Sequence, residues 1–237
     1  MQQTALIVAV FEFAILIFSL CVHECSHAWM ASRLGDQTAR MEGRVTLNPM
    51  YHVDPLGTLL FPAIVIFGPL IGFNMFGGML VGWAKPTPVI TRNFKKIVRD
   101  DNLTTLAGPA SNLMLVLVAF IVLVVDAKVT PNGNAVVFNS FIAALEPVEG
   151  FTPQPVVLLC ALTILINLML CIFNLLPIPP LDGSRLVRNM LPYNAVQTYD
   201  RIPFWVSYLL MIFVGGMIIR AFVTPAIRLV LWGLLHL

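Results

Sequence analysis

The sequence predicts an all-α polytopic membrane protein, and three observations support this. First, its 237 residues are 58% apolar and only 11% charged, with a mean hydropathy of +0.87, unlike soluble domains. Second, it contains several uncharged runs of about 20 residues, the length of a membrane-crossing helix. Third, the basic residues gather in the loops between these runs. The net charge of +2 gives no reason to expect a nucleic-acid partner.

The first predicted element is the apolar run 4–31. It is too long for the core of a signal peptide, so we expect it to be retained as a membrane-spanning helix. Further full spans are expected over the runs 103–125, 155–176 and 203–219. A last run, 221–237, carries Arg228 and is too short to assign as a full span, so a short C-terminal helix is the expectation there. The expectation is therefore about four full transmembrane helices in a single domain, 1–237.

The apolar run 56–82 differs from the others because glycines and prolines interrupt it. Proline removes a backbone hydrogen bond and glycine weakens a helix, so this run predicts a re-entrant or broken segment. A re-entrant segment would place three basic loops on one face: 32–55, 83–102 and 177–202. The loop 126–154, whose only basic residue is Lys128, would lie opposite. The positive-inside rule then predicts cytoplasmic basic loops and an external N-terminus.

Two short segments predict β-strands at the membrane surface. They are 43–49 (GRVTLNP) and 85–90 (KPTPVI), which alternate or are β-branched and are bounded by proline. Proline would restrict such strands to the edge of a sheet.

The first apolar run contains an H-E-x-x-H pattern, His23 to His27. On a helix the two histidines lie one turn apart on the same face and can bind one ion, while Glu24 stands beside them to accept a proton from water. In a soluble sequence, the favoured explanation of the pattern would be buried, hydrogen-bonded histidines. Inside a membrane span, unligated polar groups are costly, so the sequence favours a metal site of the zinc-hydrolase kind.

A catalytic zinc takes a third protein ligand and keeps a fourth position for water. The sequence leaves several candidates for the third ligand: Glu12, His52, Asp54, Asp182, His236 and the cysteines. Asp182 stands out because prolines break the apolar run just before it, in FNLLPIPPLDGSRL. If 56–82 is re-entrant, His27 and Asp182 lie on the same side of the membrane. Charge bias and metal binding therefore favour the same topology.

Three asparagines in the apolar runs have alternative interpretations. Asn174, at the helix break, could stabilise an oxyanion or bond to another helix. For Asn167, a hydrogen bond between helices is the favoured role. Asn112 ends the stretch LAGPASN, 106–112, whose small residues should let this helix pack closely against the metal site, and it is placed to bridge to a neighbour.

Three segments together resemble the site-2 proteases, a family of intramembrane zinc metalloproteases. They are HECSHAW at 23–29, LAGPASN at 106–112 and NLLPIPPLDGSR at 174–185, and their order, spacing and membrane placement match over most of the chain. The stretches GRVTLNPMYHVDPLGTLLFP and VGWAKPTPV resemble the compact prokaryotic branch, which has no PDZ or CBS domain.

The resemblance implies that His23, His27 and Asp182 bind one zinc ion per chain. It implies that Glu24 is the general base and that Asn174 stabilises the reaction intermediate. The surface strands are expected to receive the substrate as an extended segment through main-chain pairing.

The resemblance also implies that Asn112 and Asn174 contact the substrate. The implied reaction is hydrolysis of peptide bonds in or near transmembrane segments of membrane proteins, in regulated proteolysis or clearance of signal-peptide remnants. The implied location is the inner (plasma) membrane, with the active site towards the cytoplasm.

Two other functions are compatible with parts of the pattern. A metal carrier or scaffold would keep the ligands but would have no need of Glu24 as a base. Another class of membrane metallopeptidase completes its site with a glutamate from a later helix. The sequence disfavours that class, because no glutamate after Glu24 lies within an apolar run.

Overall fold

The computed structural model describes residues 2–73, 83–145 and 151–236. Regular structure in these residues is entirely helical. Four helical stretches of the described chain are long and apolar enough to cross a membrane: Ala5–Leu34, Ile97–Val129, Pro155–Asn174 and Gly216–Leu235. The prediction of an all-α polytopic membrane protein with about four spans is confirmed.

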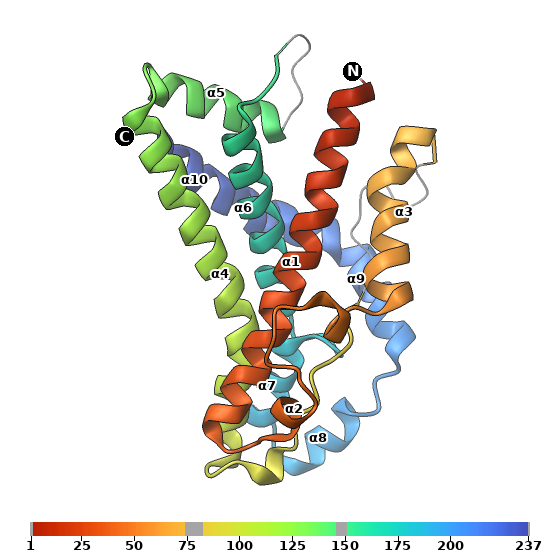
Figure 1. Ribbon diagram of the computed structural model, residues 1–237. Helices are drawn as coiled ribbons and strands as arrows, with labels where there is room; N and C mark the ends of the chain where they lie inside the picture. The colour runs from red at the N-terminus through yellow and green to blue at the C-terminus, as the bar shows by residue number, and fades with distance from the viewer. Residues whose placement is uncertain (1, 74–82, 146–150, 237) are drawn as a thin grey trace.

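Three long helices form the body of the molecule (Figure 1): α1 (Gln2–Leu34), α4 (Ile97–Val129) and α6 (Pro155–Asn174). α4 packs extensively along both α1 and α6. α6 is the most buried of the candidate spans, because it contributes to both apolar cores. The outer faces of α1 and α4 expose large aliphatic side chains, as expected of a surface that meets lipid.

Shorter elements connect these helices. They are α2 (Thr38–Met41), η1 (Pro49–Tyr51), η4 (Thr91–Asn93), α5 (Gly133–Leu145), α7 (Asp182–Met190) and α8 (Tyr193–Tyr199). α5 lies in the loop predicted over 126–154. It forms there because Val137 and Phe141 are completely buried against α4 and α6, a packing partner that the local sequence does not reveal.

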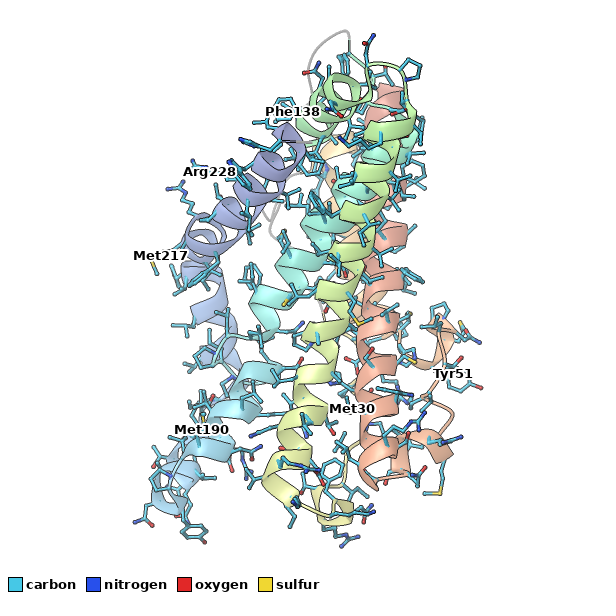
Figure 2. All side chains as sticks on the ribbon, turned by 90° about the vertical axis from the view of Figure 1, so that its left-hand side faces the viewer. Met30, Tyr51, Phe138, Met190, Met217 and Arg228 are labelled. Carbon is cyan, nitrogen blue, oxygen red and sulfur yellow. The ribbon has the colours of Figure 1, made fainter. Side chains whose placement is uncertain are left out.

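The C-terminal helices differ from the prediction. α9 (Phe204–Ile218) occupies the run expected to span, but a π-helical turn, η5 (Ile219–Val223), continues it into α10 (Thr224–Leu235). The expected short C-terminal helix is α10, but the candidate span is Gly216–Leu235, so it lies later in the chain than the predicted span 203–219. Arg228 lies exposed on the outer side of α10 (Figure 2). An arginine there keeps its charged end away from the core and does not interrupt the helix.

The segment predicted to be re-entrant or broken, 56–82, forms three short helices as far as the chain is described, and its residues 74–82 lie outside the described ranges. The three helices are η2 (Pro55–Leu60), α3 (Phe61–Phe67) and η3 (Gly68–Ile71), which rise beside α1 (Figure 1). Where the described chain resumes, the Trp83 N–H donates to the Gly57 carbonyl at 3.1 Å, and the Lys85 N–H donates to the His52 carbonyl at 2.9 Å. The chain before and after this segment therefore meets at one level of the bundle, as a re-entrant path requires.

The prediction of surface strands is wrong, because 43–49 and 85–90 are described and neither forms a β-ladder. In 85–90 the two prolines have no N–H, and the N–H groups of Thr87 and Ile90 donate hydrogen bonds to side-chain carboxylates. In 43–49 the Arg44 N–H closes a turn onto α2. These N–H groups already have partners in side chains and turns, so neither segment pairs with another strand of the described chain.

Asp36 connects the end of α1 to residues 90–93. Its buried carboxylate accepts hydrogen bonds of 2.6 to 3.1 Å from the N–H and hydroxyl of Thr38, the N–H of Ile90 and the amide of Asn93. Burial alone would raise the pKa of the Asp36 carboxyl, but these hydrogen bonds outweigh burial and lower that pKa.

We predict that Asp36→Asn lowers the melting temperature of the detergent-solubilised protein at neutral pH, because an amide cannot accept all of these bonds. Since the folded-state pKa is lowered, the stabilisation is complete above the ordinary carboxyl pKa of about 4 and is lost as pH falls through the folded-state value. Thermal scans across this range should show the parent and the variant converging on acidification. A constant difference at every pH would contradict the prediction.

Candidate metal centre

The two histidines of the H-E-x-x-H pattern lie in the last third of α1 and face α4. His23 is 4% exposed and His27 is 6% exposed. Their rings meet edge to face with centroids 4.6 Å apart, and their Nε2 atoms are 3.0 Å apart. The helix therefore presents both imidazoles to one point, as the spacing predicted.

Asp182, the first residue of α7, brings a third group to this point. Its Oδ2 atom lies 3.1 Å from Nε2 of His23 and 3.3 Å from Nε2 of His27. Within the described chain, these residues are the single group of histidine, cysteine and acidic side chains whose potential ligand atoms converge. Sequence segments 155 positions apart thus meet, as the topological interpretation required.

Two other candidates for the third ligand have different roles. His52 is buried, with Nε2 2.8 Å from the carbonyl oxygen of Thr46. The Asp54 carboxylate accepts hydrogen bonds from the N–H groups of Leu56 and Gly57 and so caps the start of η2. Both residues stabilise the chain that enters the broken segment.

The hydrogen bonds of the imidazoles leave both Nε2 atoms as acceptors. Nδ1 of His23 lies 2.7 Å from the side-chain oxygen of Asn112, and Nδ1 of His27 lies 2.8 Å from the carbonyl of Thr104. Oxygen acceptors require each Nδ1 to carry the proton of a neutral ring. The two Nε2 lone pairs then face Oδ2 of Asp182, which is buried and accepts no hydrogen bond from the described residues. Three acceptors facing one point favour a cation between them.

The spacing of the three atoms fits zinc. Ligand atoms at about 2.0–2.1 Å from a tetrahedral zinc ion lie about 3.3 Å from one another, and the observed separations are 3.0, 3.1 and 3.3 Å. Two imidazole nitrogens and a carboxylate oxygen are also a ligand set used by catalytic zinc, which leaves a fourth position for water.

Gly108 lets α4 approach the two imidazoles. A β-carbon at this position would lie 2.4 Å from Nε2 of His27 and 2.6 Å from Nε2 of His23. Both distances are far inside van der Waals contact, so any larger residue would displace the ligands. The close packing expected from the small residues of 106–112 is therefore observed at the site itself.

We predict that Gly108→Ala abolishes stoichiometric zinc binding while the protein still inserts and purifies in detergent. The added methyl group occupies space that the two Nε2 atoms require. Gly216→Ala is a matched control, because a β-carbon there meets no atom within 4 Å. Elemental analysis of the purified proteins tests this, and full zinc occupancy in Gly108→Ala would contradict it.

Asn112 and Asn167 connect His23 to the two neighbouring helices. The Asn112 amide donates to the Asn167 side-chain oxygen at 2.8 Å. The Asn167 amide donates at 2.9 Å to the hydroxyl of Ser19 and to the carbonyl of Thr163. This polar chain runs through α4, α6 and α1, and both asparagines are completely buried. Asn167 thus bonds between helices as predicted, while a substrate contact by Asn112 stays a prediction.

We predict that Asn112→Leu weakens zinc binding by about 10- to 100-fold, the usual effect of losing an outer partner of a metal-ligating histidine. Leucine has a similar volume but leaves Nδ1 of His23 without its acceptor. Asn134→Leu, on the exposed surface of α5, controls for the general effect of the substitution. Competition with a chelator measures the affinity, and equal values for parent and Asn112→Leu would contradict the prediction.

Polar contacts with the start of α4 hold α7 and thereby place Asp182. The guanidinium of Arg185 donates to Asp101 at 2.7 Å, and the amide of Asn189 donates to Asp101 at 2.7 Å and to Asn102 at 2.8 Å. These contacts were not predicted, because the sequence placed Arg185 only within the basic loop 177–202. The helical spacing of residues 182, 185 and 189 is the signal that could have grouped them on one face.

Glu24 is not a member of the ligand cluster. It is half-buried, and its Oε2 atom accepts hydrogen bonds from the N–H of Thr87 at 3.0 Å and from the Thr87 hydroxyl at 2.7 Å. No other described residue donates to this carboxylate. No sequence pattern predicts this contact, because Glu24 and Thr87 are 63 positions apart.

Asn174 is the last residue of α6, and its amide donates to the Leu170 carbonyl of the same helix at 2.9 Å. The amide has two N–H groups, so this bond leaves one free. The predicted oxyanion and substrate contacts of Asn174 stay predictions.

The fold and the site define a class: a polytopic helical membrane protein with a His–His–Asp cluster that could hold a metal ion. The chain matches peptidase family M50 over residues 11–214. It therefore belongs to this family, the site-2 protease family. The resemblance stated from the three sequence segments is confirmed.

Curated relatives agree with this assignment. YwhC of Bacillus subtilis (strain 168), named as a candidate zinc metalloprotease, is 35% identical over 221 residues, covering 93% of this chain and 84% of that protein. Rip2 of Mycolicibacterium smegmatis, named in the same way, is 33% identical over 167 residues, covering 70% of this chain and 52% of the relative. Rip2 of Mycobacterium tuberculosis (strain H37Rv) is 28% identical over 200 residues, covering 84% of this chain and 64% of that protein.

No solved structure matches the chain significantly. Family membership and the names of the relatives support a metalloprotease.

Proposed function

We propose that this protein is an intramembrane zinc metalloprotease that hydrolyses peptide bonds in or near transmembrane segments of membrane proteins. The observation that carries the proposal is the convergence of His23, His27 and Asp182, with Glu24 on the same helix turn. The site lies between helices long and apolar enough to cross a bilayer, so the natural substrate is a chain that reaches the site from the membrane.

The three ligands would hold one zinc ion, which when bound lowers the pKa of a water molecule and polarises a peptide carbonyl. Glu24 accepts the proton of the attacking water and then delivers it to the leaving amine. The free N–H of Asn174 stabilises the developing oxyanion. Asn112 and Thr104 keep both imidazoles in the tautomer that presents Nε2.

Residues 83–90 are proposed to receive the substrate as an extended chain. Lys85 and Thr87 each precede a proline, which restricts their backbone to extended conformations. Among the described residues, none donates a hydrogen bond to the carbonyls of 84–89, so these acceptors are available for main-chain pairing. A membrane helix hides its own carbonyls in internal hydrogen bonds and must unwind first. Glycine and proline in the target span would favour unwinding.

The proposed location is the inner (plasma) membrane, with the metal centre towards the cytoplasm. Three basic loops would then lie on the cytoplasmic side and the N-terminus outside, in agreement with the positive-inside rule. The return of the chain from Gly57 to Trp83 supports this topology. Residues 1–237 would act as a single domain.

We predict that Glu24→Gln retains zinc but loses cleavage by on the order of 100-fold or more, because glutamine cannot accept the proton. Asp182→Ala should lose much of its zinc and much of its cleavage activity, because the substitution removes a metal ligand. The test compares these variants with the parent in detergent, measuring zinc by elemental analysis and cleavage with a model transmembrane peptide that contains glycine and proline. Full cleavage by either variant would refute the proposal. A parent that binds zinc but cuts nothing would favour a carrier or scaffold.

A further inference from the structure

Thr87 holds the side chain of Glu24 from outside α1. The Thr87 N–H lies 3.0 Å from Oε2. The Thr87 hydroxyl lies 2.7 Å from the same oxygen and 3.1 Å from the backbone carbonyl of Glu24. A hydroxyl has one proton, so the Thr87 hydroxyl donates along the shorter contact, to the carboxylate oxygen Oε2. Both donors therefore act on Oε2, and no described residue donates to Oε1.

The segment that carries Thr87 is fixed on both sides. The Trp83 N–H donates to the carbonyl of Gly57 and the Lys85 N–H donates to the carbonyl of His52. The Ile90 N–H donates to the Asp36 carboxylate at 2.7 Å. The flanking prolines have a fixed φ angle. Thr87 thus has little freedom to turn away, and its donors form a preorganised contact for a carboxylate.

We infer that Thr87 is a positioning residue for Glu24, fixing the carboxylate through Oε2 so that Oε1 is the atom that accepts the proton. The inference rests on the proposed function, in which Glu24 is the base. A free glutamate side chain populates several rotamers, and a half-buried one gains little restraint from packing. Two hydrogen bonds to one oxygen select one rotamer and leave the other oxygen free.

The same segment is proposed to hold the extended substrate. Through Thr87, the segment 83–90 therefore positions both the Glu24 carboxylate and the proposed substrate backbone. A displacement of 83–90 would move both of them together. A purely structural role predicts something different: Thr87 would only attach the segment to α1, as Asp36 does at Ile90. The two roles separate experimentally, because Asp36→Asn loosens the segment without contacting Glu24.

The test compares Thr87→Val, Thr87→Ser, Thr91→Val and Asp36→Asn with the parent, in detergent and with zinc supplied. Thr87→Val removes the hydroxyl and keeps the size, Thr87→Ser restores the hydroxyl, and Thr91→Val makes the same change at an exposed position of η4. We expect Thr87→Val to keep its zinc and to lower kcat by about 10-fold with little change in KM. Thr87→Ser should recover most of kcat, Thr91→Val should match the parent, and Asp36→Asn should act mainly on KM.

An unchanged kcat in Thr87→Val, no recovery in Thr87→Ser, or a loss confined to KM would each overturn the inference. A second measurement does not depend on catalysis: a double-mutant cycle of Thr87→Val and Glu24→Ala on the melting temperature. We expect Thr87→Val to be less destabilising when Glu24 is already alanine, and additive effects would overturn the contact. If the parent cleaves no peptide, the proposed function fails, while the cycle still decides whether Thr87 and Glu24 are coupled.

Discussion

Three hydrogen-bond acceptors converge within 3.3 Å in an apolar helical bundle, and the surrounding structure serves to keep them there. Oxygen acceptors fix the tautomers of His23 and His27. Gly108 leaves the space that their rings occupy. The ion pair between Arg185 and a buried aspartate attaches α7 to α4 and so sets the position of Asp182. Without a metal ion or an added proton on one imidazole, this arrangement would bring lone pairs together in an apolar surrounding, which is costly.

Much of the metal centre could be predicted from the sequence, because its key signals are local or topological. His23 and His27 are related by one helical turn, which needs no tertiary information. Predicting Asp182 required a further step: a re-entrant 56–82 places His27 and Asp182 on the same side of the membrane. The hydrogen bond from the Trp83 N–H to the Gly57 carbonyl supports this topology.

The remaining features could not be predicted from the sequence, because they depend on which groups meet in space. Thr87 lies 63 positions after Glu24, and no periodicity connects them. The β-branched character of 85–90 suggested a strand, but propensity does not reveal that its N–H groups are donated to carboxylates. Likewise, the sequence shows that the last apolar run carries Arg228, and only the structure shows that this arginine lies on the outer side of α10.

The buried chain from Ser19 through Asn167 and Asn112 to His23 also bears on how the protein is assembled. Each of α1, α4 and α6 would enter the bilayer carrying a polar side chain that lipid cannot satisfy. Docking of the three inserted helices supplies every one of these groups with its partner at once. The hydrogen bonds that orient His23 therefore also favour the docking of the separate spans into one bundle, so the candidate metal centre and the tertiary structure form together.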